Sequence, residues 1–147
     1  MTPQRITLVT LGVADMDRSR AFYAALGWQM HPQSQAEVTF YQANGFVFGL
    51  FGLGPLAADQ GRPDATLGTG ASALAQNFAT EAEVDAAFAQ AMDAGAVALK
   101  APEKVFWGGY SGYFADPDGH VWELAMNPFW PLNEDGSLTL PDPPDAD

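Results

Sequence analysis

The chain carries near its C-terminal end the stretch Asp116-Pro117-Asp118-Gly119-His120-Val121-Trp122-Glu123-Leu124. Its first four residues are typical of a tight turn, because proline presets one backbone angle, aspartate bonds neighbouring N–H groups, and glycine adopts angles that other residues avoid. The residues that follow, 120–126, predict a strand. Side chains alternate along a strand, so Trp122 and Leu124 are expected to pack in the core while Glu123 faces the opposite side.

A second pattern lies near the N-terminus. Residues 6–13 are rich in β-branched residues and leucine and predict a strand, and Asp15 is suited to cap a helix over residues 16–26 that ends at Gly27. Short strands are then expected at about 28–32, 38–42 and 46–51. The dipeptide Asn44-Gly45 predicts that the last two strands form a hairpin.

The same order of elements recurs in the second half of the chain. Residues 71–79 predict a strand, Thr80-Glu81-Ala82-Glu83 forms a capping-box pattern, and the helix over residues 81–94 should end at Gly95. Strands are expected next at 97–99, 108–114 and 120–126. Each half therefore has a strand, a capped helix, a glycine and three further strands, which indicates an internal repeat.

This repeat predicts an α+β fold of two βαβββ modules in tandem, each a curved mixed sheet that forms a cleft, with one helix per module on the outside. Residues 1–127 would form a single domain, with module 1 at about 5–52 and module 2 at about 71–127. Residues 53–70 are rich in Gly, Pro, Ala and Asp and predict a linker with a helical turn near 56–60. Residues 128–147 predict a Pro-rich, acidic, extended tail.

Composition excludes several classes of function. The 147 residues contain no cysteine, which excludes disulfides, cysteine-based metal sites and a thiol nucleophile. Six basic against 18 acidic residues give a formal net charge of −12, so nucleic acid and anionic membrane surfaces are not expected partners. The N-terminus has no signal-peptide pattern and there is no apolar run of transmembrane length, so we expect a cytoplasmic protein.

The two motifs together resemble the vicinal oxygen chelate superfamily, which includes glyoxalase I, bleomycin-resistance proteins and extradiol dioxygenases. The first motif is residues 13–23, Val-Ala-Asp-Met-Asp-Arg-Ser-Arg-Ala-Phe-Tyr, with Leu26-Gly27 closing the helix, and the second is residues 116–124. The likeness extends from about Arg5 to Asn127. It implies a small molecule held in the cleft of a curved sheet, often with a divalent metal, and a homodimer.

The resemblance also implies where a metal would bind, namely at positions on the first and last strands of each module. Counting seven residues back from the helix caps Asp15 and Thr80 gives Leu8 and Ala73, and counting four on from the turn glycines Gly45 and Gly119 gives Gly49 and Glu123. Of these four residues, which are Leu8, Gly49, Ala73 and Glu123, only Glu123 is a metal ligand. A lone carboxylate does not hold a divalent cation, so no cofactor is predicted.

The candidate site residues are Glu123 and three aromatic residues before it. Glu123 lies in an apolar strand, which suggests a carboxylate that contacts or deprotonates a substrate, or else a structural acid paired with another group. Residues 106–114 contain five aromatic residues separated by glycines, and Trp107, Tyr110 and Tyr113 would stack on a flat or apolar ligand. The alternative is that these rings only fill the core. By sequence alone, His120 and His31 are more typical of surface imidazoles, and Arg18 and Arg20 of solvated helix charges.

Two functions from different classes follow. The first is a metal-independent small-molecule-binding protein of the bleomycin-resistance type, with an aromatic-lined cleft for an apolar or aromatic ligand, and with a preference for a cation if Glu123 opens onto that cleft. The alternative is a divalent-metal-dependent lyase, similar to glyoxalase I, in which Glu123 is a metal ligand or base. An extradiol dioxygenase is disfavoured, because its iron needs two histidines and a carboxylate on one side. The sequence leaves open whether the protein is an enzyme.

Overall fold

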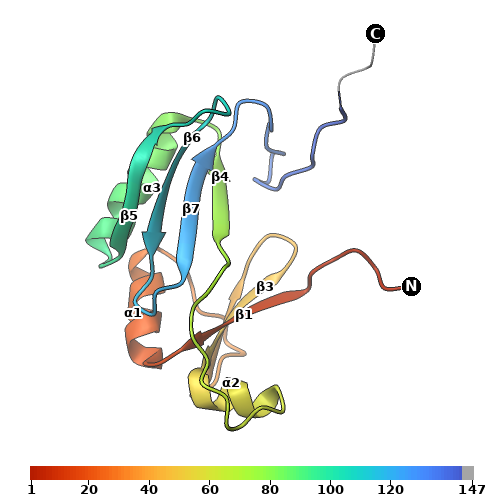
Figure 1. Cartoon of the computed structure of the whole chain (residues 1–147), viewed down its shortest axis with the longest axis vertical. Coiled ribbons are helices and arrows are strands. Elements are labelled where there is room, and N and C mark those ends of the chain that lie inside the picture. Colours follow the sequence, from red (N-terminus) through yellow and green to blue (C-terminus); the bar gives the residue numbers. More distant parts are fainter. Residues whose placement is uncertain (144–147) are drawn as a thin grey trace.

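Two separate sheets and three helices make up the fold in the computed structural model, which describes residues 1–143 (Figure 1). Residues 144–147, the end of the predicted tail, lie outside the described residues. The first sheet has the order β1-β3-β2, with strands β1 (Leu8–Val13), β2 (Val38–Gln42) and β3 (Val47–Gly52). The second has the order β4-β7-β6-β5, with strands β4 (Leu74–Phe78), β5 (Val97–Lys104), β6 (Tyr110–Ala115) and β7 (Val121–Met126).

The two sheets repeat one pairing scheme, and this confirms the predicted α+β fold of two related modules. The first strand of each module runs parallel to the last, β1 beside β3 and β4 beside β7, while the remaining neighbours are antiparallel. Helix α1 (Met16–Ala25) follows β1, and α3 (Glu81–Asp93) follows β4 and packs along the second sheet. None of the helices in residues 1–143 is long and apolar enough to cross a membrane.

The helix ends follow the expected chemistry. The Asp15 side chain accepts a hydrogen bond from the Arg18 N–H, and the Thr80 side chain accepts one from the Glu83 N–H, at 3.1 Å in both cases. The second half of the capping box differs, because the Glu83 carboxylate reaches the N–H of Ala79, one residue before the cap. These caps satisfy N–H groups that the first turn of a helix leaves without intrahelical partners.

Three predicted elements need correction. Residues 28–32 do not form a strand: His31 N–H donates to the Phe40 carbonyl at 2.7 Å, but Pro32 has no N–H and the ladder ends there. Strand β5 is longer than the predicted 97–99, with register shifts that accommodate Pro102 at the edge of the sheet. The linker begins with a helix of its own, α2 (Leu53–Asp59), which is longer than the expected turn.

The two sequence motifs are bonded directly to each other, and these bonds join module 1 to module 2. Asp116, only 2% exposed, accepts hydrogen bonds from the Tyr23 hydroxyl at 2.7 Å and from the N–H groups of Asp118 and His120. Asp118 in turn accepts from the Ala14 N–H and the Ser19 hydroxyl and pairs with Arg18. A buried carboxylate is tolerated when such donors surround it. We call this set of bonds the inter-module lock.

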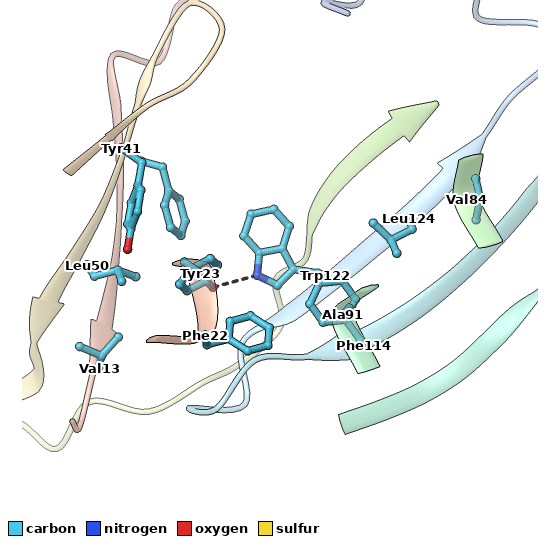
Figure 2. Close-up of a cluster of buried hydrophobic side chains, with 11 residues drawn as sticks. Val13, Phe22, Tyr23, Tyr41, Leu50, Val84, Ala91, Phe114, Trp122 and Leu124 are labelled. Atoms are coloured by element: carbon cyan, nitrogen blue, oxygen red, sulfur yellow. Dashed lines mark hydrogen bonds between the residues drawn. The ribbon is translucent and has the colours of Figure 1, made fainter. Parts of the chain in front are cut away.

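An aromatic core surrounds the lock. Figure 2 shows Tyr23 between side chains of the two sheets, with its hydroxyl accepting a hydrogen bond from the Trp122 indole at 3.1 Å. Phe48 and Tyr41 of the first sheet lie within 6 Å of the Tyr23 ring, and Phe114 stacks parallel to Trp122 from the second sheet. One helix residue therefore contacts the cores of both modules. As predicted, Trp122 and Leu124 are buried here.

Removing the Tyr23 hydroxyl tests the lock. Tyr23→Phe leaves the Asp116 carboxylate without one donor, so we expect a loss of about 1–3 kcal/mol in the free energy of unfolding at pH 7. Tyr110→Phe is the matched control, because that hydroxyl bonds to the exposed side chain of Asp85. Urea unfolding of both variants and the wild type gives the comparison. An equal loss of unfolding free energy in the two variants would show that the buried hydroxyl of the lock stabilises the protein no more than an exposed hydroxyl does.

The same residue predicts a loss of stability at high pH. Burial, followed by the neighbouring Asp116 charge, raises the pKa of Tyr23 far above its usual value of 10.0. The native phenol therefore keeps its proton where the unfolded phenol releases it. The stabilisation is fully present below pH 10 and falls as the pH rises further, by up to about 1.4 kcal/mol per pH unit. In urea titrations from pH 8 to 11, Tyr23→Phe should show a shallower decline than the wild type.

Candidate functional site

The open face of the second sheet brings together the central candidate residues. Pairing places Glu123 of β7 between Ala75 of β4 and Tyr113 of β6. The Tyr113 hydroxyl donates to Glu123 Oε2 at 2.8 Å, and this hydrogen bond, more than burial, raises the pKa of Tyr113. The phenol therefore remains a neutral donor that orients the carboxylate. Glu123 is partly buried and faces away from the core, as the alternation along β7 predicted.

Glu123 opens onto a cleft of about 960 Å³. Its lining includes β4 and β7, the turn before β6, the β2–β3 turn and the segment after β7. These elements contribute Asn44, Phe46, Ala75, Asn77, Trp107, Glu123, Ala125, Asn127, Phe129, Trp130, Leu132, Gly136, Ser137 and Leu138. Among these described lining residues, Glu123 is the one ionisable side chain, and it lies among aromatic, aliphatic and amide groups. The cleft suits a small molecule by size and character.

Trp107 lies in this cleft because of the glycines that follow it. Its ring folds back over Gly109, so that a Cβ added at Gly109 would lie 1.7 Å from Trp107 Cζ3. Gly108 has a φ of +91°, and a Cβ there would lie 3.1 Å from the Phe129 ring. The hairpin turn closes through the Val105 N–H, which donates to the Gly109 carbonyl at 3.0 Å. The glycines thus permit two aromatic rings to pack directly on the backbone.

Tyr110 is not brought together with the other three candidates. Its hydroxyl donates to Asp85 of α3 at 2.6 Å, and this hydrogen bond is the main cause that raises the pKa of Tyr110 to about 12. Its ring packs against the hydrophobic core. Residues 110 and 113 lie on opposite faces of β6, because their separation is odd. The structure therefore places Tyr110 on the helix-covered face of the second sheet.

The equivalent face of module 1 has different residues. Pairing places Gly49 of β3 between Thr10 of β1 and Phe40 of β2, so Gly49 occupies the place of Glu123 and Phe40 that of Tyr113. The cleft here is about 320 Å³ and is lined by Thr7, Leu8, His31, Gln33, Phe40, Gln42 and Val47. The module 1 cleft has no counterpart of the Glu123 carboxylate.

The family's metal positions do not fit a metal ion. Leu8, Gly49 and Ala73 offer no side-chain donor, and the direct neighbour of Glu123 on β4 is Ala75. Within residues 1–143 no group of three or more His, Asp or Glu side chains is arranged to hold a metal. The donor set is thus one carboxylate, and that carboxylate already accepts the Tyr113 hydroxyl.

His120 and Arg20 were predicted to be solvated, and the structure shows both bonded within the fold. His120 is partly buried and its Nε2 lies 2.7 Å from the Gly12 carbonyl, which places the proton on Nε2 and adds a bond between the modules. Arg20 donates to the Thr39 hydroxyl and to the carbonyls of Gln35 and Val38. Both residues are structural. His31, by contrast, is exposed at the small module 1 cleft.

Sequence reasoning missed the contribution of the C-terminal segment. Phe129, Trp130, Leu132 and Leu138 all line the Glu123 cleft, although residues 128–147 were expected only to form an extended tail. The available signal was composition, because extended tails that stay in solvent are poor in aromatic and aliphatic residues. Asn44 and Asn77 were also missed, since amides in turns and strands have many structural uses.

The fold and the site together define a class of protein: two related modules in one chain, each built on a mixed sheet whose open face forms a cleft. A family model, the Glyoxalase/Bleomycin resistance protein/Dioxygenase superfamily, matches residues 5–124. The chain belongs to this superfamily. The predicted resemblance is therefore confirmed.

Solved structures agree with this assignment. A glyoxalase-related enzyme from Fulvimarina pelagi is 39% identical, with a TM-score of 0.88 over 94% of this chain and 99% of that one. A lactoylglutathione lyase from Agrobacterium tumefaciens shares the fold at 23% identity, with a TM-score of 0.67 over 86% of this chain and 96% of its own. Uncharacterised proteins from Mycobacterium bovis and Mycobacterium tuberculosis are 45% identical over 47 residues, which is 32% of this chain. The match spans less than a third of each mycobacterial chain.

The position of Trp107 is testable through Gly109. Gly109→Ala places a methyl group where the indole lies, so we expect Trp107 to leave the cleft. The indole N–H resonance of Trp107, assigned with Trp107→Phe, should move towards the position of a solvent-exposed tryptophan. Gly54→Ala is the control, since nothing lies within 4 Å of the added Cβ. An unmoved resonance in Gly109→Ala would contradict the packing.

Proposed function

We propose that the protein binds a small apolar or aromatic molecule in the Glu123 cleft without a metal. The observation that supports this proposal most is the composition of the cleft: its described lining has one carboxylate, no second His, Asp or Glu, and walls of aromatic and aliphatic side chains. Burial of flat apolar surface against these walls would supply most of the affinity. Glu123 and the amides would fix the orientation of the ligand.

The charge of the cleft favours a cationic ligand. Glu123 is the ionisable group of the described lining, and Trp107 and Trp130 present electron-rich rings to the same space. Such rings attract organic cations, most strongly where water is excluded. The Tyr113 hydroxyl donates to Oε2 of Glu123, which leaves Oε1 for the ligand. We therefore propose a planar organic cation, or a molecule with a polarised N–H donor, as the ligand class.

A metal-dependent lyase is the second candidate, and one observation favours it: Glu123 occupies the last-strand ligand position of the family. The remaining ligands would have to come from a partner subunit or from oxygens of the substrate. Without a metal, the same carboxylate would act as a base next to a carbonyl. The hydrogen bond from Tyr113 opposes that role, because it already occupies one of the two oxygens of the carboxylate.

The proposal includes a homodimer. The open side of the first sheet and the segments beside it expose apolar residues: Ile6 is 70%, Leu8 46% and Met30 51% exposed. Apolar surface of this kind is stabilised when it is covered by another chain. A second copy would cover the module 1 cleft, where Leu8 lies, and leave the Glu123 cleft of each chain for the ligand.

Metal binding separates the two candidates. The purified, untagged protein is analysed for bound metal by mass spectrometry and titrated with Ni²⁺, Zn²⁺, Mn²⁺ and Fe²⁺, with Glu123→Ala as the control. We expect no stoichiometric binding and no difference between wild type and variant. Binding of one equivalent that is lost in Glu123→Ala would overturn the metal-independent proposal and favour the lyase.

Ligand charge is tested with three probes of one size: 1-methylquinolinium as the cation, quinoline as the neutral ring and naphthalene-2-sulfonate as the anion. Tryptophan quenching at pH 8 should show the order cation, neutral ring, anion. Glu123→Gln should weaken binding of the cation about tenfold and leave the neutral ring unchanged. Glu103→Gln removes the same charge from the exposed edge strand β5 and is the control. Equal loss in both variants would indicate only an effect of net charge.

A further inference from the structure

The C-terminal segment forms a wall of the cleft and is attached to both modules. Residues 128–138, which we call the strap, follow β7 and contribute Phe129, Trp130, Leu132, Gly136, Ser137 and Leu138 to the lining. At one end the Phe129 ring packs on the β5–β6 turn at Gly108. At the other end the Asn44 side chain, in the β2–β3 turn of module 1, donates to the Asp135 carbonyl. Figure 1 shows this segment beyond the end of β7.

The strap has a shape of its own. The Gly136 N–H donates to the Asn133 carbonyl and the Asn133 N–H to the Ser137 carbonyl, both at 2.9 Å, and Gly136 has a φ of +86°. The Asn133 side chain also bonds the hydroxyls of Ser137 and Thr139. These bonds close a compact turn at residues 133–137. The strap would therefore move as a preformed unit.

Its attachment to the rest of the protein is weak. In the described chain, the Asn44–Asp135 bond is the one hydrogen bond between residues 128–143 and residues 1–126, and it lies at the surface. No strand of either sheet includes the strap. Trp130 is 40% and Phe129 66% exposed, so a large part of both residues is in contact with solvent. Segments with few buried contacts and exposed hydrogen bonds open at low free-energy cost.

We propose that the strap opens to admit the ligand and closes over it, with Asn44 as its catch and Trp130 as a ligand-binding residue. The choice of a planar cation as ligand rests on the proposed function. Closure would place the Trp130 ring against a ligand whose opposite side contacts Glu123. It would also exclude water from the ion pair between the Glu123 carboxylate and the cationic ligand. Asn44 is a positioning residue, because it contacts the strap and acts on the ligand only through it.

Asn44 is a suitable residue for the test. Its backbone has a negative φ, and the hydrogen bond of the hairpin turn runs between Ala43 and Phe46, so Asn44→Ala removes the catch and leaves the turn. Gln42→Ala is the matched control: it lies on the same hairpin, and its side chain bonds only carbonyls of that hairpin. Since the chain has no cysteine, any introduced thiol is a unique reporter.

Opening of the strap is measured in the full-length chain with Ala125→Cys, which places a thiol in the lining of the cleft. Alkylation by iodoacetamide should be about fivefold faster when Asn44→Ala is added, the factor expected from the loss of one net hydrogen bond. Gln42→Ala should not change the rate. A thiol at the exposed Ala89 of α3 reports any general change in reactivity. If Ala125→Cys does not fold, Ala75→Cys on β4 replaces it.

Equal alkylation rates with and without the Asn44 side chain would overturn the proposal that Asn44 holds the strap closed. Protection by 1-methylquinolinium then tests whether Trp130 binds the ligand. The probe should slow alkylation of the Ala125→Cys protein, and much less so when Trp130→Ala is added. Phe106→Ala, which removes an exposed aromatic ring, is the control and should leave the protection unchanged. Protection that survives in Trp130→Ala would remove Trp130 from the site. Faster alkylation in Asn44→Ala without any binding of the probe would support the strap and overturn the proposed ligand class, so the two failures are distinguishable.

Discussion

The fold depends on one buried carboxylate. Asp116 lies in the turn before β7 and accepts a hydrogen bond from the Tyr23 hydroxyl, which belongs to the helix of the other module. It also accepts hydrogen bonds from two N–H groups of its own turn. Because an unpaired charge at this depth is very costly, the donors from the turn and from the helix both stabilise the buried carboxylate. The Tyr23 hydroxyl in turn accepts a hydrogen bond from the Trp122 indole, so that this side chain contacts the aromatic residues of both modules. The motifs that define the family are, in this chain, the two sides of a single contact.

The two modules share a framework and differ in their open faces. The register that aligns Glu123 with Tyr113 and Ala75 in module 2 aligns Gly49 with Phe40 and Thr10 in module 1. The backbone pairing around these positions is the same, so the difference at these positions lies in the side chains. Module 2 keeps an oriented carboxylate in a large cleft, whereas module 1 has a smaller cleft without one. The two modules therefore share the pairing of their three central strands and differ in the chemistry of their open faces.

The sequence was sufficient for those features that depend on local rules. Caps at Asp15 and Thr80, the glycine ends of the helices and the faces of β7 follow from neighbours a few residues apart. The strand predicted at residues 28–32 failed where a proline interrupted the ladder. Arg20 and His120 were read as solvated groups because their partners, on β2 and near the end of β1, come from distant parts of the chain.

The candidate site shows the same limit. Glu123, Trp107 and Tyr113 could be selected from pattern and resemblance, and alternation along β6 could also have separated Tyr110 from Tyr113. The strap could not be predicted, because a proline-rich segment gives no periodic signal and its place depends on contacts with Asn44 and Gly108, which are distant in the sequence. Its aromatic residues were the available clue. Local patterns predict elements well, but they do not show which distant surface an irregular segment covers.

The lock and the strap lie at opposite ends of β7, since one precedes Val121 and the other follows Met126. A strand of this length separates them by about 20 Å. The bonds that join the two modules are thus remote from the segment that forms a wall of the Glu123 cleft. Under the proposed function, substitutions in the strap would therefore change the lining of the cleft, and with it the choice of ligand, without removing any bond of the lock.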